Sequence, residues 1–418
     1  MEPNLNKTFD GKLEVTGRVQ SFISYLHYQN NLRVIDEFRI RAVDGKTHSD
    51  VKLVVNLKSI DDLFSDPFEL YLDEVGPASR EEEINLRLLP QLFAAITANQ
   101  VAEMTFELKV GDTSLGSTSV TTEIYPLNSW KYDPKNLSND ALLLASFSQP
   151  GDPAIPGIVA RARTIKSTMM SQNGQTYDPN TVGYQAPSLE AVQDEVQALY
   201  EAIQELNIEY SNPFPNFNLD GQPIRSVSEI LKDGSATCLD TAMMMASCLT
   251  HMKLHPIVIL VPGHAFAGVI LRKATLRPIM NAFEITGAVE AGLIAIFETT
   301  TLCTSKTKVS FRDAQARVKE KLDPDWNPWH PEKYEAEKDK RLVLDVVSTY
   351  LNCGIRPLPS VTIAPNGEVT IVQTELPKIE FNFTGSTDTP KISLRDDESP
   401  ERVKIWKTSL LDMTLNNP

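Results

Sequence analysis

The chain has few of the features that mark secreted or metal-binding proteins. Among its 418 residues are four cysteines, Cys238, Cys248, Cys303 and Cys353, and no two of them have C-x-x-C spacing. This pattern argues against a disulfide framework and against a zinc site. We therefore expect reduced thiols, a cytoplasmic location and no metal or other cofactor.

Long apolar runs are also missing. The opening stretch MEPNLNKTFDGK has no apolar core segment, so the sequence predicts no signal peptide. The most apolar stretch, HPIVILVPGHAFAGVIL, contains Pro262 and His264 and is too short to cross a bilayer. We expect no association with a membrane.

The chain has fewer basic than acidic residues. The chain has 40 Lys and Arg against 55 Asp and Glu, a net charge of −15. Such a surface repels a phosphate backbone on average, so we expect no direct nucleic-acid binding by this region. It also has no G-x-x-x-x-G-K-[ST] motif, so this chain alone is not expected to hydrolyse nucleotides.

The N-terminal part alternates apolar and polar residues. The runs KLEVTGRV, EFRIRA, DVKLVVNLK and EMTFELKV have period two, with turn residues between them. This pattern predicts an antiparallel β-sandwich over residues 10–128, about the length of an immunoglobulin-like domain. We find no motif for chemistry in it.

After the N-terminal part, apolar residues recur with the spacing of an α-helix. In SLEAVQDEVQALYEAIQEL, Val192, Val196, Leu199 and Ile203 lie on one face, and Ser188 is an expected N-cap. We interpret residues 138–325 as an α+β domain. We interpret residues 326–418 as a connecting segment, with a hairpin pattern in SVTIAPNGEVTIVQTEL, that leads to a truncated C-terminal module.

The stretch GSATCLDTA places Cys238 at the expected start of a helix. The run CLDTAMMMASCLTHM has no Gly or Pro, and small residues precede it. Unpaired N–H groups and the positive end of the helix dipole stabilise a thiolate at such a position. Cys248, inside the helix, is more simply a packed apolar residue.

Two later residues complete a candidate site. His264 begins an expected strand after PIVILV, and Glu298 ends the next expected strand, AGLIAIF. A thiolate–imidazolium pair makes cysteine nucleophilic at neutral pH, and the imidazole needs an orienting group on its other nitrogen. The sequence therefore predicts a Cys238–His264–Glu298 site. The simpler alternative is a domain that keeps the fold only for binding.

Gln222 and Arg225, which precede Cys238 in the sequence, each have more than one interpretation. Gln222, in GQPIR, is a candidate donor to an oxyanion together with the Cys238 N–H. Arg225 is a candidate partner for an acidic group such as Asp240, or for substrate. A structural role is the simpler interpretation of both residues.

The order of cysteine, histidine and acid across helix, strand and strand resembles the transglutaminase-like cysteine-protease superfamily, which is related to papain. In that superfamily an Asp commonly lies in an Asp-Pro-Thr turn, whereas this chain has Glu298-Thr299-Thr300. The resemblance implies that Cys238 is the nucleophile, His264 the base and Glu298 its orienting acid.

A narrower resemblance covers nearly the whole chain. The segments LLLASFSQPGDPAI, VGYQ, ALYEAIQELNIEYSNPFPNF, TCLDTA, GHAFAG and CGIRPLP resemble the N-terminal region of very large bacterial superfamily 1 helicases. This resemblance implies a missing C-terminal helicase or nuclease module and, by analogy, a role in antiviral (phage) defence.

Taken together, the sequence predicts a multi-domain protein with an all-β immunoglobulin-like sandwich followed by an α+β transglutaminase-like domain. The expected activity is that of a cysteine peptidase or isopeptidase that acts on a protein or peptide. The alternative, from another class, is a catalytically inactive module that senses a partner and controls the helicase part.

Overall fold

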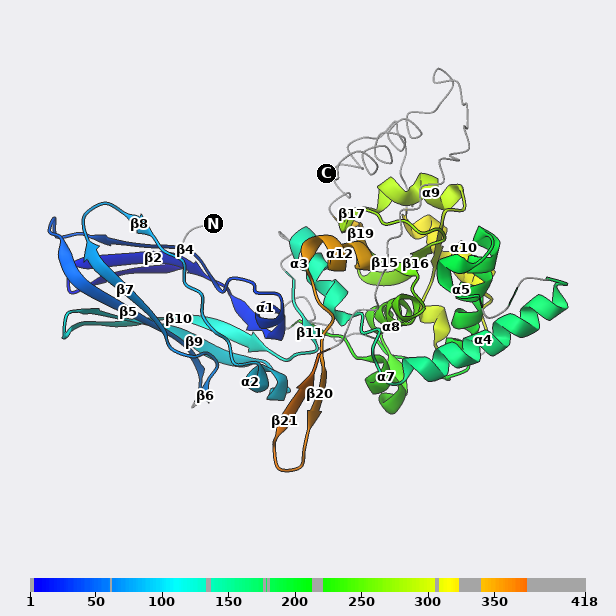
Figure 1. Ribbon diagram of the computed structural model, residues 1–418, viewed down its shortest axis with the longest axis horizontal. Helices are drawn as coiled ribbons and strands as arrows, with labels where there is room; N and C mark the ends of the chain where they lie inside the picture. Colours follow the sequence, from blue (N-terminus) through cyan, green and yellow to red (C-terminus); the bar gives the residue numbers. More distant parts are fainter. Residues whose placement is uncertain are drawn as a thin grey trace, which may run out of the picture. The chain divides into compact units, whose positions relative to one another are not determined.

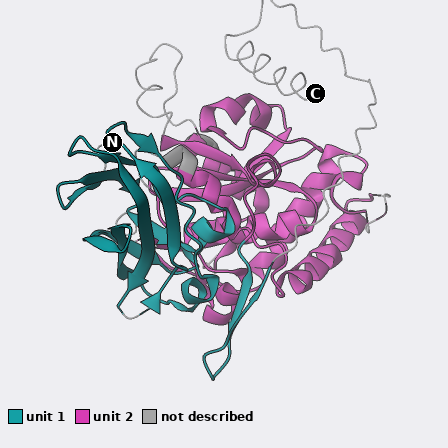
Figure 2. Ribbon diagram, turned by 60° about the vertical axis from the view of Figure 1, so that its left-hand side comes forward, with its two compact units in different colours: residues 1–129, 358–373 teal, residues 130–357, 374–418 magenta. Residues whose placement is uncertain are grey.

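The computed structural model describes residues 4–60, 62–132, 137–175, 178, 181–212, 221–304, 308–322 and 340–373. The protein is a mixed α/β chain with several sheets (Figure 1). It divides into two compact units, residues 1–129 with 358–373 and residues 130–357 with 374–418 (Figure 2).

The first unit is built mainly of strands in two sheets. One sheet has the order β1-β2-β4-β8, and the other has the order β3-β10-β9-β5-β6, with β7 also paired to β5. Its elements are β1 (Leu5–Phe9), β2 (Leu13–Val19), β3 (Phe22–Ser24), α1 (Tyr25–Gln29), β4 (Ile35–Ala42), β5 (His48–Ser59), β6 (Asp62–Leu63), β7 (Phe68–Val75), β8 (Arg80–Glu81), α2 (Pro90–Ala95), β9 (Gln100–Val110), β10 (Thr113–Tyr125), β20 (Ser360–Ile363) and β21 (Val369–Val372).

Alternation along these strands builds the core. In β5 the residues Val51, Leu53, Val55 and Leu57 are buried while most of their neighbours are more exposed. Since successive strand residues point to opposite faces, this pattern buries one face of the sheet. Phe38 of β4 stacks on Phe106 of β9 with ring centroids 6.3 Å apart, so side chains of the two sheets meet in one core.

The predicted strands of this unit form, with different limits. The first strand begins at Leu5, ahead of the expected boundary at residue 10. The predicted hairpin of SVTIAPNGEVTIVQTEL forms as β20 and β21, and these strands belong to the first unit rather than to a connecting segment.

The second unit contains a five-stranded antiparallel sheet of order β17-β19-β15-β16-β18. Its elements are α3 (Leu137–Leu144), η1 (Ala145–Phe147), α4 (Ile155–Gln172), η2 (Gly183–Gln185), α5 (Leu189–Gln204), β12 (Glu209–Tyr210), β13 (Gln222–Pro223), α7 (Val227–Asp233), β14 (Ser235–Ala236), α8 (Cys238–His251), β15 (His255–Val261), β16 (His264–Ile270), β17 (Ile279–Asn281), η3 (Ala282–Ile285), α9 (Thr286–Glu290), β18 (Ile294–Phe297), η4 (Thr300–Leu302), α10 (Phe311–Leu322), β19 (Leu342–Asp345) and α12 (Val346–Cys353). Residues 129–130 form β11 (Ser129–Trp130).

Local signals explain the two helices that matter most. Ser188 caps α5 by accepting from the Ala191 N–H at 3.2 Å, as its sequence predicts. Helix α8 is buried at every residue from Cys238 to Thr250, because small and apolar side chains cover all its sides. It packs in one core with residues of β16 and β18 such as Val269 and Phe297.

The predicted end of this domain at residue 325 is wrong. Strand β19, residues 342–345, lies between β15 and β17 inside the sheet, so the domain includes residues expected in a connecting segment. All four residues of β19 are buried, as in a central strand. This strand was not predicted because a short apolar run without alternation cannot be told from other buried segments by its periodicity. Residues 323–339 and 374–418 lie outside the described part.

Strand β16 packs tightly against its neighbours at Gly268. A Cβ at this position would lie 2.7 Å from the Ala295 carbonyl oxygen and 3.0 Å from side-chain atoms of Ile257 and Ile296. We expect Gly268→Ala to lower the free energy of unfolding by about 1–3 kcal/mol, since overpacking displaces backbone as well as side chains. Urea denaturation measures this change.

Gly157 in α4 is the matched control. Apart from its chain neighbours and the backbone of its own helix, no atom lies within 4 Å of a Cβ built there. Because alanine favours a helix over glycine by about 0.5–1 kcal/mol, Gly157→Ala should stabilise the protein. Equal effects of the two substitutions would contradict the close packing of β16 against β18.

Candidate active site

Cys238 is the first residue of α8. Its N-cap, Thr237, has an extended backbone, and its hydroxyl accepts from the Asp240 N–H at 3.2 Å. The Asp240 carboxylate in turn accepts from the Thr237 N–H at 2.9 Å. This capping box fixes the first turn and leaves the thiol at the positive end of the helix dipole. The predicted position of Cys238 at a helix start is confirmed.

An ion pair to a buried carboxylate holds the loop that follows Gln222 against the same turn. Asp240 is 0% exposed, and its carboxylate accepts from Arg225 Nη2 at 2.7 Å, from Nε at 3.1 Å and from the Arg225 backbone N–H at 2.8 Å. Of the two functional roles considered for Arg225, the pairing with Asp240 is confirmed. The pair positions the residues around Cys238.

His264 and Glu298 lie side by side at the same end of the sheet. His264 begins β16, and Glu298 follows β18, which runs antiparallel to it. The His264 Nε2–H donates to both carboxylate oxygens of Glu298, at 3.0 and 2.9 Å. The structure therefore brings the predicted base and the predicted acid together.

Glu298 is buried but has several donors. The Thr300 N–H and hydroxyl donate to its Oε1 at 3.1 and 2.9 Å, and Lys321 of α10 donates to its Oε2 at 2.5 Å. Burial alone would raise the pKa of Glu298, but the hydrogen bonds from His264 and Lys321 outweigh it and lower the pKa to about 2. Glu298 is therefore a carboxylate at neutral pH.

The same contacts favour the imidazolium form of His264. Burial would lower the pKa of His264, but hydrogen bonding to Cys238 and to Glu298, with the charge of Glu298, raises it to about 9. Because Nε2 is occupied by Glu298, Nδ1 is the nitrogen left for the thiol. Cys238, His264 and Glu298 thus form one connected set, in which Lys321 acts against the imidazolium charge.

Tyr210 is a neighbour of the thiol that sequence reasoning missed. Strand β12 runs parallel to β14, with Tyr210 opposite Ala236, two residues before Cys238. Burial raises the pKa of Tyr210, and interactions with Cys238 and Glu298 raise it further. Its side chain is nevertheless exposed, at 43%. The sequence carried no signal for it, because the pairing of such short strands leaves no period.

Gln222, the proposed oxyanion donor, is a buried residue of β13. It is 7% exposed, and its Nε2 has no hydrogen-bond partner among the residues that the structure describes. A buried amide donor without an acceptor is uncommon in a protein of known structure. The Gln222 Nε2 can therefore donate a hydrogen bond to an acceptor on a bound molecule.

The other cysteines differ from Cys238 in their surroundings. Burial raises the pKa of Cys303 to about 11, and it raises the pKa of Cys248 well above its ordinary value. Both therefore stay thiols at neutral pH. Cys353 is exposed, and partial burial raises its pKa as well.

Comparisons with known proteins add no identification. No family model matches the chain, and no curated protein matches it significantly. No described residues form a group of three or more His, Cys, Asp and Glu that could hold a metal ion. Across the same residues, every helix is too short or too polar to cross a membrane.

The charges around His264 predict opposite effects of two substitutions. In Glu298→Gln the imidazolium loses its carboxylate, so the pKa of His264 should fall below about 9, by about one to three pH units. In Lys321→Met the imidazolium loses an unfavourable charge, so the pKa of His264 should rise. NMR of the His264 ring protons against pH measures both shifts.

Lys232, exposed in the last turn of α7, supplies the control. Lys232→Met should leave the titration of His264 unchanged. Shifts in the same direction for Glu298→Gln and Lys321→Met would rule out this electrostatic account. An unchanged titration of His264 in Glu298→Gln would mean that Glu298 does not set the charge state of the imidazole.

Proposed function

We propose that the second unit is a thiol-dependent acyl-transfer enzyme. The observation that supports this most directly is the connected set of three residues. A thiol at the start of α8 interacts with His264, whose other ring nitrogen donates to the buried carboxylate of Glu298. A nucleophile, a base and an orienting acid in this order form the arrangement that acyl transfer requires.

The reaction begins when the Cys238 thiol passes its proton to His264. The sulfur attacks the carbonyl carbon of an amide or ester, and the carbonyl electrons move to its oxygen. The intermediate collapses as His264 gives its proton to the leaving amine or alcohol. His264 then removes a proton from water, which attacks the thioester and releases the acid and Cys238. Glu298 keeps the ring oriented throughout.

Two donors are suited to the developing oxyanion. The Cys238 N–H lies at the first position of α8, where helix N–H groups have no intrahelical acceptor. The Gln222 amide is buried and has no described partner. Donors of this kind are each worth about 10²–10³ in rate, because they bind the transition state more strongly than the substrate.

Hydrolysis fits this chain better than transamidation, since water is always present and the described residues show no amine-binding feature. The proposed substrate is a protein or peptide. We assign the second unit to a transglutaminase-like fold and the first to an immunoglobulin-like sandwich, and the sheet orders above support both assignments. The resemblance to helicases supports a place in a larger bacterial defence protein.

Gln222→Leu tests the proposed oxyanion donor. The substitution should lower the rate at which p-nitrophenyl acetate acylates Cys238 by about 10²-fold. It should leave iodoacetamide alkylation unchanged, because alkylation forms no oxyanion. Mass spectrometry of the labelled peptide measures both rates. Equal loss in both reactions would show that Gln222 has only a structural role.

Cys238→Ala tests the proposed nucleophile. The acyl adduct should disappear, while Cys248→Ala should keep it, because burial holds Cys248 as a thiol. If wild-type Cys238 reacts with p-nitrophenyl acetate no faster than the exposed Cys353, the chain is instead the inactive sensing module. That result would end the catalytic proposal.

A further inference from the structure

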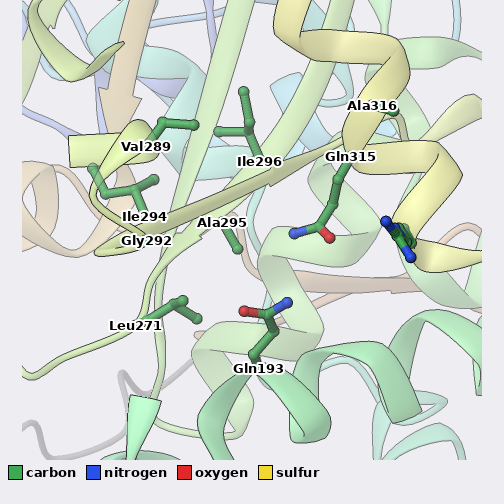
Figure 3. A pocket seen from close by; sticks show the side chains of 10 residues that line it. Gln193, Leu271, Val289, Gly292, Ile294, Ala295, Ile296, Gln315 and Ala316 are labelled. Carbon is green, nitrogen blue, oxygen red and sulfur yellow. The ribbon is translucent and has the colours of Figure 1, made fainter. Parts of the chain in front are cut away.

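A pocket of about 300 Å³ lies beside β18, away from the end that carries Glu298. Its wall includes Ile294, Ala295 and Ile296 of β18, Gln193 of α5 and Gln315 of α10 (Figure 3). Strand β18 is the last strand of its sheet, so one of its edges faces outward. The pocket therefore lies where a sheet can accept another strand.

The register shows which backbone groups point outward. The Leu271 N–H donates to the Leu293 carbonyl at 2.9 Å, and Val269 pairs with Ala295. Antiparallel pairing alternates, so Ala295 bonds to β16 while Ile294 and Ile296 direct their N–H and C=O groups to the free edge. Within the described ranges, no group bonds to these outward atoms.

Glu298 is the next residue whose backbone groups point to the free edge of β18, and there α10 supplies a hydrogen-bond partner. The Glu298 N–H donates to the Ala314 carbonyl at 3.0 Å. Ile294 and Ile296 are only 3% and 2% exposed, backbone included, so their unpaired edge groups are buried as well. Unpaired backbone groups of a buried strand are costly and favour a ligand that can pair with them.

Polar side chains flank this edge. The carboxamides of Gln193 and Gln315 extend from two helices into the space beside Ala295 (Figure 3). Neither amide has a hydrogen-bond partner among the described residues. Arg312 of α10 also lines the pocket, is exposed, and forms no ion pair within the same set of residues.

We propose that this pocket binds an extended, acidic peptide segment that adds a short strand to β18. The outward groups of Ile294 and Ile296 repeat at the two-residue spacing of a strand, about 6.7 Å, which a peptide backbone matches. The carboxamides suit peptide N–H and C=O groups, and Arg312 suits a carboxylate. This inference does not depend on the proposed acyl transfer.

Selection from a random heptapeptide phage library tests the proposal on the whole chain. Wild type should enrich peptides that contain Asp or Glu, and their affinity for Arg312→Glu should fall about tenfold. Arg317→Glu, an exposed position of α10 outside the pocket, is the matched control and should bind as wild type does. Cys238→Ala should also bind normally, which separates this site from the proposed enzyme.

Backbone pairing has its own test. N-methylation of the enriched peptide at alternate residues should abolish binding in one register only, because one face of an added strand bonds to β18. Hydrogen exchange should show bound peptide protecting the amides of Ile294 and Ile296. Failure to enrich any peptide, equal enrichment on Arg312→Glu, or binding without this protection would each overturn the proposal.

Discussion

The candidate site depends on the fully buried carboxylate of Asp240. Its two oxygens accept from the backbone of Thr237 and from Arg225, so one side chain closes the first turn of α8 and holds the loop that follows Gln222. A buried carboxylate is stable only when it is paired and hydrogen-bonded. These donors fix a single arrangement, and that arrangement places Cys238 at the start of α8 with its N–H outside the helical hydrogen-bond ladder.

The second constraint is electrostatic and concerns Glu298. A buried, ionised carboxylate needs hydrogen bonds and opposite charge to offset its desolvation. Here His264, Thr300 and Lys321 donate hydrogen bonds to it. Lys321 stabilises the carboxylate but opposes the imidazolium, whereas both Cys238 and the carboxylate favour the imidazolium of His264. The charge of the site is therefore a balance between a cation from α10 and a cation from β16. This balance follows from the packing of α10 against β18 rather than from the three predicted residues themselves.

Much of this arrangement was predictable because it is local. The helix that begins at Cys238, the strands that contain His264 and precede Glu298, and the cap at Ser188 all follow from spacing and residue type. Tyr210, Lys321 and β19 were missed because their positions depend on pairings between distant segments. Tyr210 lies 28 residues before Cys238 and Lys321 lies 23 residues after Glu298, and neither segment has a pattern that names its partner. Topology decides these contacts, and a single sequence carries little information about topology.

Helix α10 connects the two functional proposals physically. Its last turn carries Lys321, which bonds to Glu298, while Arg312 and Gln315 near its first turn line the pocket along β18. Arg312 and Lys321 are nine residues apart, about 14 Å along the helix axis. A helix of this length moves as a rigid element, and its one described backbone bond to this strand is between Ala314 and Glu298. A strand added beside Ile296 would lie next to this bond. The place at which α10 is held also sets the distance from Lys321 to Glu298, and with it the charge balance on His264.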